Sequence, residues 1–416
     1  MKSLSTYLTL LLFIWVTTCS AQQRVGKIIV PDVLTLQNGN RVTTVKQWRE
    51  QRRPELISLF KQEMYGTSPG RPQAMIFHVF DVDRHALNGK ATRKQITVLF
   101  NGKEDGPKMD ILLYLPNHVK GKIPAVVGLN FNGNQAVSAD PGIRIDTNWM
   151  SNSKGVVNNH ATEASRGSEA AQWPIETIIS RGYAVATVYR GAIDPDFDDG
   201  FKNGVQALYP ELQNRGDNFA TIAAWAWGLS RALDYLETDK AIDAKKVAVF
   251  GFSRLGKAAL WAGATDERFS LVISNESGAG GAKLFHFTGG EDIARLNSHF
   301  PHWFDQNFKK YTGHDTLLPF DQHMVIALVA PRPMYVASAI EDTNSNPEAE
   351  FWGLKAAEPV YQLYGKQQLP ANSFPAANAP VKAYNAYHVR TGKHNVTPFD
   401  WEQYLSFMDE HFKNQQ

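Results

Sequence analysis

The 416-residue sequence contains a single cysteine, Cys19, and has a formal net charge of only +2. A lone cysteine cannot form an internal disulfide, so stability must come from a packed core, for which 43% apolar residues are sufficient. The absence of a long basic tract argues against nucleic acid as the partner. The histidines show neither HExxH spacing nor cysteine partners, so we expect no metal site and no cofactor.

The N-terminus has the pattern of a secretory signal peptide. Residues 1–21 combine a lysine at position 2, an apolar stretch over 8–16 and small residues ending at Ala21. That stretch is too short for a membrane-spanning helix, and no other segment reaches the roughly 18 apolar residues that a span needs. We therefore expect cleavage near Ala21, export to the periplasm or out of the cell, and loss of Cys19. A lipoprotein acylated at Cys19 is the weaker alternative.

Strand-like and helical stretches alternate along the chain from about residue 105. Apolar runs such as IPAVVGLNF, YAVATVY, KVAVF and FSLVIS are typical of buried strands, and helical patterns lie between most of them. This alternation predicts an α/β fold with a mostly parallel sheet covered on both faces. We expect residues 22–105 to form an N-terminal extension packed on the core, and residues 106–416 to form the main domain.

Two segments do not fit as plain connections. Residues 135–175 are rich in Asn, Ser and Gly, and residues 279–320 are rich in His and aromatic side chains. Both follow strand ends that carry polar clusters. Because ligands of open α/β sheets bind at the carboxyl ends of the strands, these segments are candidate walls of a site, with surface decoration as the alternative.

Ser253 stands between a predicted strand and a predicted helix, in the stretch VAVFGFSRLGKAALWAGA. Small residues around such a turn permit a nucleophile elbow, in which the serine Oγ rises above the sheet and free N–H groups of the helix start face an oxyanion. The alternative is that Ser253 only caps the helix. The order of an α/β-hydrolase, serine then acid then histidine, favours the elbow, because Glu276, Asp342 and His394 each follow a later predicted strand.

These residue types suit nucleophilic catalysis. A histidine can take the serine proton near neutral pH and return it to the leaving group. A carboxylate is needed to fix the histidine tautomer and to stabilise the imidazolium. Glu276 and Asp342 compete for that role, and both are expected within reach of His394.

The stretch GFSRLGK resembles the G-C-S-R-x-G-K signature of glucuronoyl esterases, carbohydrate esterase family 15. The resemblance extends over roughly residues 105–412, through YAVATVYRGAIDPDF, AWAWGLSRALDYLETDK, LVAPRPMYVASAIEDT and HNVTPFDWEQYL. It implies an α/β-hydrolase three-layer sandwich, with a mostly parallel central sheet and inserted loops around the active site.

The resemblance also implies a role for individual residues. It makes Ser253 the nucleophile, His394 the base and Glu276 the acid used by most members, so we expect Glu276 to matter more than Asp342, the position that bacterial members use instead or as well. The remaining matched residues are Arg254, which helps to hold the oxyanion, and Lys257 and Glu291, which bind hydroxyls of the glucuronoyl ring.

Two positions depart from the family pattern. Phe252 stands where many members have a cysteine that forms a disulfide in fungal enzymes, which fits an exported bacterial-type protein. Asn344 stands where many bacterial members have a tryptophan that packs against the sugar, so we expect little preference for a 4-O-methyl group. Trp303 and Trp352 are the candidates to replace that tryptophan.

The expected function is that of a serine esterase cleaving the ester between (4-O-methyl-)glucuronic acid of glucuronoxylan and lignin alcohols. One alternative is an acetyl (xylan) esterase or another carbohydrate ester hydrolase. Another is an inactive carbohydrate-binding relative on the same fold. The expected partners are the glucuronoxylan and lignin-carbohydrate ester substrates, with no nucleic acid and no membrane span, and we expect a monomer.

Overall fold

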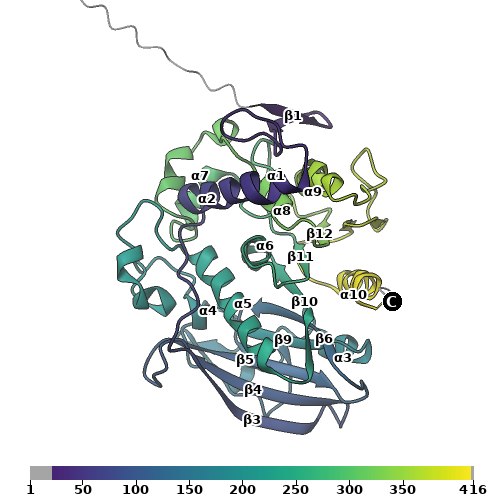
Figure 1. Cartoon of the computed structure of the whole chain (residues 1–416). Helices are drawn as coiled ribbons and strands as arrows, with labels where there is room; N and C mark the ends of the chain where they lie inside the picture. Colours follow the sequence, from purple (N-terminus) through teal and green to yellow (C-terminus); the bar gives the residue numbers. More distant parts are fainter. Residues whose placement is uncertain (1–20, 414–416) are drawn as a thin grey trace, which may run out of the picture.

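The computed structural model describes residues 21–413 (Figure 1). The predicted signal peptide, Cys19 included, lies outside the described residues except for Ala21. Within the described range, none of the helices is both long enough and apolar enough to cross a bilayer.

A single large sheet organises the chain. Its ten strands are β3 (Ile76–Ala86), β4 (Ala91–Leu99), β5 (Lys108–Pro116), β6 (Ile123–Asn130), β9 (Ala184–Tyr189), β10 (Ile242–Phe252), β11 (Leu271–Asn275), β12 (Met334–Ala339), β13 (Val381–Lys382) and β14 (Ala386–Arg390). They lie in the order β13-β14-β12-β11-β10-β6-β9-β5-β4-β3. The consecutive neighbours from β14 to β9 pair in parallel. The predicted α/β fold with a mostly parallel sheet is therefore confirmed.

The antiparallel strands lie at the two edges of the sheet. β3, β4 and β5 form a meander that joins the parallel part through the antiparallel pair β5–β9. Because β3 and β4 come from residues before 106, the boundary expected at 105 falls between two paired strands of one sheet. At the other edge, the short strand β13 pairs antiparallel with β14.

Helices cover both faces of this sheet (Figure 1). They are α1 (Val45–Gln47), the π-helix η1 (Trp48–Arg52), α2 (Arg53–Glu63), α3 (Ile175–Ser180), α4 (Arg190–Ile193), α5 (Thr221–Thr238), α6 (Arg254–Thr265), α7 (Ile293–His299), α8 (Gln322–Ala327), α9 (Pro347–Leu363) and α10 (Pro398–Phe412). Short 3₁₀ turns and two small hairpins, β1–β2 (Gln22–Val25, Ile28–Pro31) and β7–β8 (Val156–Val157, His160–Ala161), complete the described elements.

Alternation along β10 shows how the layers form. Val247 and Val249 belong to the larger core, which packs against α5, α6, α8 and α9. Ala248 and Phe250 point to the opposite face and join the core under α3 and α10. Since successive side chains of a strand point to opposite faces, the stretch 247–252 of β10, which has no polar residue, must be covered on both faces. The site residues then lie where these strands end.

Candidate active site

Ser253 occupies a sharp turn between β10 and α6. Its backbone has φ 58°, a left-handed conformation that a residue with a side chain adopts only when the surroundings impose it. The helix comes back so close to the strand that a Cβ on Gly251 would lie 2.0 Å from the carbonyl oxygen of Leu255. The Ser253 side chain makes no helix-capping hydrogen bond. The turn is thus a nucleophile elbow in geometry, and Gly251 is required for it.

Ser253, His394 and two carboxylates form a continuous hydrogen-bonded chain. The Ser253 Oγ lies 2.9 Å from His394 Nε2. On the other side of the ring, Nδ1 lies 2.6 Å from Asp342 Oδ2 and 3.1 Å from Glu276 Oε2. Glu276, Asp342 and His394 each have an oxygen or nitrogen atom within 4.8 Å of the other two, close enough to bind a metal ion. These atoms already take part in the hydrogen bonds of the site.

The two carboxylates lie in different surroundings. Burial raises the pKa of Glu276 to about 7, although His394 and Arg390 favour its charged form. Burial also disfavours the charged form of Asp342, but hydrogen bonds from His394 and Ser345 outweigh it and lower the pKa of Asp342. Asp342 makes the shorter contact with His394, so the geometry favours Asp342 as its direct partner. The resemblance instead pointed to Glu276.

His394 is partly open to solvent, with 39% of its side chain exposed. Burial of the remainder lowers its pKa, but the hydrogen bonds with Asp342 and Glu276 outweigh that effect and raise the pKa to about 9. Both carboxylates therefore stabilise the imidazolium that forms when the histidine accepts a proton. The Phe252 ring packs on the histidine at 4.6 Å between centroids and limits how far it can turn.

Arg254 begins α6 directly after the serine. Its Nη1 donates to Asp196 Oδ2 at 2.5 Å, and its guanidinium lies over the Trp303 ring at 4.7 Å. Arg190 forms an ion pair with the same carboxylate. Burial disfavours the charged form of Asp196, but Arg190, His302 and Arg254 together hold its pKa well below the usual range. Two arginines thus share one anion, and a net positive charge is left beside the nucleophile.

Lys257 and Glu291 meet as a pair, one turn further along α6. The Lys257 Nζ donates to the carbonyls of Ser277 and Ala279, both at 2.7 Å, and lies 3.0 Å from Glu291 Oε2. These contacts use the three donors of an ammonium group. The Lys257 side chain is only 4% exposed and that of Glu291 15%. Glu291 is therefore the member of the pair that a ligand reaches more easily.

The two tryptophans that could replace an apolar platform do not lie free at the surface. Trp303 is buried and stacked on Phe300, with 3.7 Å between the ring centroids. Trp352 in α9 lies against Gly26 of the β1–β2 hairpin, within 3 Å of where a Cβ on that glycine would sit. Asn344 itself is exposed, and its carbonyl accepts from the Glu291 N–H at 2.8 Å.

The two polar segments contribute to the site to different extents. The segment 279–320 supplies Glu291 and also His302 and Trp303, whose ring N–H groups meet Asp196. The segment 135–175 reaches the histidine loop through Gln172, whose Nε2 donates to Asn395 Oδ1 at 2.9 Å.

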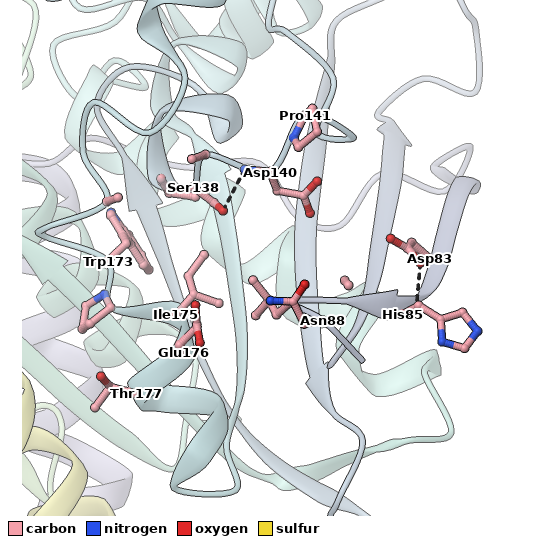
Figure 2. A pocket seen from close by; sticks show the side chains of 16 residues that line it. Asp83, His85, Asn88, Ser138, Asp140, Pro141, Trp173, Ile175, Glu176 and Thr177 are labelled. Atoms are coloured by element: carbon pink, nitrogen blue, oxygen red, sulfur yellow. Dashed lines mark hydrogen bonds between the residues drawn. The ribbon is translucent and has the colours of Figure 1, made fainter. Parts of the chain in front are cut away.

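The pocket of about 570 Å³ in Figure 2 lies elsewhere. It is lined by the β3–β4 turn, residues 137–141 and the start of α3, and none of the predicted catalytic residues takes part. Its Asp140 accepts hydrogen bonds from Arg93 and from the Tyr114 hydroxyl, so this carboxylate is held by structural contacts. Trp173 in the same wall is buried and offers no stacking surface. Nothing in this pocket competes with Ser253 as a reaction centre.

Sequence reasoning missed several charged residues of the site, among them Asp196 and Arg390. Asp196 lies in the stretch YRGAIDPDF, which carried part of the resemblance but received no role. Arg390 lies four positions before His394, at the end of β14. A charged residue at the end of a mostly apolar strand is a usable signal. Its partners, however, come from distant parts of the chain, and only the fold identifies them.

Known proteins with similar sequences are carbohydrate esterases. The family model described as glucuronyl esterase, fungi, matches residues 169–365. The carbohydrate esterase MZ0003, from an unknown prokaryotic organism, is 46% identical over 396 residues, covering 94% of this chain and 91% of that protein. A 4-O-methyl-glucuronoyl methylesterase 1 from Wolfiporia cocos is 31% identical over 292 residues, covering 66% of this chain and 67% of the relative.

Solved structures with a similar fold are esterases as well. A structure described as a promiscuous CE15 esterase from a marine bacterial metagenome superimposes with a TM-score of 0.87 at 46% identity, covering 94% of this chain and 98% of the other. A glucuronoyl esterase from Solibacter usitatus gives a TM-score of 0.87 at 46% identity, with 92% and 98% covered.

Proposed function

Because the chain belongs to carbohydrate esterase family 15, the glucuronoyl esterases, we propose that it hydrolyses the ester between (4-O-methyl-)glucuronic acid of glucuronoxylan and lignin alcohols. The observation that carries the proposal is the contact of Ser253 Oγ with His394 Nε2 at 2.9 Å, with two carboxylates behind the ring. This arrangement suits acyl transfer through a covalent intermediate.

The proposed reaction has two steps. The Ser253 Oγ attacks the C6 carbonyl of the uronic acid while His394 takes its proton, and the imidazolium then gives this proton to the departing alcohol. Water attacks the resulting glucuronoyl-serine ester, with His394 again as base, and releases glucuronic acid and free Ser253. Arg254 is proposed to face the tetrahedral oxyanion, where a fixed positive charge is most effective.

Glu291 and Lys257 are proposed to select the sugar. The Glu291 carboxylate can accept a hydrogen bond from a ring hydroxyl, and Lys257 holds that carboxylate in place through its 3.0 Å contact. A site built this way discriminates against esters without ring hydroxyls, because its buried polar groups would then lose their partners.

The test compares kcat/KM on benzyl glucuronate, benzyl 4-O-methyl-glucuronate and a sugar acetate. We expect the glucuronates to be hydrolysed at least tenfold faster than the acetate. The exposed Asn344 offers no apolar face, so the methylated and unmethylated esters should differ by less than about 1 kcal/mol, the scale of one buried methylene. A kcat/KM on the sugar acetate equal to that on the glucuronates would favour a general carbohydrate esterase. No turnover of any of the three substrates would favour an inactive relative.

Export is proposed from the signal peptide pattern at residues 1–21. The N-terminal sequence of the protein recovered from culture supernatant or periplasm tests it. We expect the mature chain to begin near residue 22, whereas a lipid-modified N-terminus at Cys19 would replace this proposal with the lipoprotein.

A further inference from the structure

Arg390 has the densest set of polar contacts around the histidine loop. Its Nη2 lies 2.7 Å from Glu276 Oε1, 3.0 Å from the Lys393 carbonyl and 2.6 Å from the Asn395 carbonyl. These two carbonyls belong to the residues immediately before and after His394. A single guanidinium therefore touches one acid of the site and the backbone on both sides of the base.

Further contacts hold this guanidinium through Asp400. The Arg390 Nε donates to both oxygens of Asp400, at 3.2 and 2.9 Å. Asp400 is in turn fixed at the start of α10, where it accepts from the Thr397 N–H and hydroxyl, both at 2.7 Å. The Arg390 side chain is 3% exposed and both of its carboxylate partners are 0% exposed. A planar group with donors in fixed directions suits such a multiple contact, and a flexible ammonium does not.

Glu276 completes the unit on the side of the base. One of its oxygens meets Arg390, and the other meets His394 Nδ1 at 3.1 Å and the Asn395 N–H at 3.1 Å. An isolated carboxylate in such a buried place would be neutral, because burial disfavours the charged form. Burial raises the pKa of Glu276 to about 7, and the hydrogen bond from His394 and the neighbouring Arg390 cation keep it from rising further.

We propose that Arg390 is a positioning residue of the esterase, favouring the carboxylate form of Glu276 and holding the loop of His394 in the orientation that faces Ser253. The proposal rests on the proposed Ser253–His394 mechanism. Arg390 acts only through Glu276 and the loop and does not touch the substrate.

The charges around this unit determine the direction of the expected pH effect. Without Arg390, the pKa of Glu276 rises further above about 7, so Glu276 stays neutral over more of the assay range, where His394 loses one of its two anionic neighbours. The pKa of His394 then falls, so the acid limb of the kcat/KM profile moves to lower pH. The titratable and charged groups packed around the unit are Asp342 after β12, Glu350 in α9, His388 in β14, Asp400 and Tyr404 in α10, and Lys393 on the loop itself.

The experiment measures kcat/KM on benzyl glucuronate from pH 5 to 10 for Arg390→Met, Arg390→Lys, Glu276→Gln and the double variant Arg390→Met/Glu276→Gln. We expect Arg390→Met to lower kcat by about 10- to 100-fold and to move the acid limb to lower pH. Glu276→Gln should move the limb in the same direction, and adding Arg390→Met to it should cause no further movement. Arg390→Lys keeps a cation but loses the contacts with the Lys393 and Asn395 carbonyls. Its kcat should therefore fall, while the acid limb of the kcat/KM profile stays at the pH of the parent.

Two controls separate the possible failures. Arg332→Met removes a partly buried arginine that binds backbone carbonyls, at the opposite end of β12. It should lower the melting temperature without moving the acid limb. Ser253→Ala tests the mechanism itself. If it retains activity, the proposed mechanism fails.

If Ser253→Ala is inactive but Arg390→Met leaves the limb unmoved, Arg390 is only structural and the positioning role is overturned. Asp400 keeps its contacts with Thr397 and His388 in Arg390→Met, which favours folding of that variant. If it still fails to fold, Arg390→Lys decides, and an unchanged kcat there contradicts the proposal.

Discussion

Replacing the two carboxylates behind His394, singly and together, tests how this site stabilises its base. Asp342 and Glu276 both contact Nδ1, at 2.6 and 3.1 Å, and together they raise the pKa of His394 to about 9 from its ordinary value near 6.5. A negative charge favours the imidazolium, so Asp342→Asn and Glu276→Gln should each lower that pKa. Because 39% of the histidine side chain is exposed, solvent screening reduces the effect, and we expect about one pKa unit for each carboxylate.

The effect on turnover should be strongly non-additive. Where a single acid serves the histidine, its amide replacement lowers kcat by about 10⁴-fold, because the wrong tautomer is favoured. Here the remaining carboxylate can still hold Nδ1–H, so each single variant should lose only about tenfold at high pH. The double variant should lose about 10³- to 10⁴-fold, well beyond the roughly 100-fold product of the singles. Asp342→Asn should be the slower single variant because Asp342 makes the shorter contact.

The assay is kcat and kcat/KM on benzyl glucuronate between pH 5 and 10, with melting temperatures to confirm folding. The acid limb should lie above pH 6.5 in the parent and move down by about one unit in each single variant. A double variant no slower than Asp342→Asn would show that Glu276 takes no part in supporting the base. A limb that moves to higher pH in either variant would refute the electrostatic reasoning.

Four further outcomes are expected. Ser253→Ala should lower kcat by about 10³-fold or more with an unchanged melting temperature, and turnover within tenfold of the parent would contradict the serine mechanism. Arg254→Ala should lower kcat by about 10²- to 10³-fold with little change in KM. Arg254→Lys should restore little of that kcat, because lysine lacks the planar guanidinium fork. An effect confined to KM would instead place Arg254 in substrate binding. Gly251→Ala should lower the free energy of unfolding by more than about 2 kcal/mol in denaturant unfolding, because the new Cβ would meet the Leu255 carbonyl. Gly70→Ala is the control. A Cβ there meets nothing within 4 Å, so its free energy of unfolding should stay within about 1 kcal/mol of the parent. Burial raises the pKa of Asp305 to about 8, so the folded state holds a proton that the unfolded state releases near pH 4. The stability of the protein should therefore fall as the pH rises between these two values. Asp305→Asn should make the fall in melting temperature over that range smaller.

The local features of this protein follow from short stretches of its amino-acid sequence. The run VAVF followed by GFSRLGK indicated a buried strand, a tight turn and a helix, and the structure has these elements at β10 and α6. The order of Ser253, the two acids and His394 along the chain predicted that they follow strand ends, and the structure brings all four side chains together. Such inferences succeed because strand and helix periodicity and turn chemistry depend on neighbouring residues.

The distant groups that complete the site are identified only by the folded chain. The sequence placed residues 76–99 in an extension, yet they pair into the central sheet through the β4–β5 register, since strand pairing is a contact between segments that the periodicity of either one cannot specify. The sequence did not decide whether Glu276 or Asp342 is the direct partner of His394. That depends on where the loops after β11 and β12 place the two carboxylates. Arg390 meets Glu276 across 114 positions of chain and Asp196 meets Arg254 across 58. Three of these four charged side chains are buried, and they find partners only because the sheet brings the carboxyl ends of its strands together. Burying a charge without a partner would cost too much free energy.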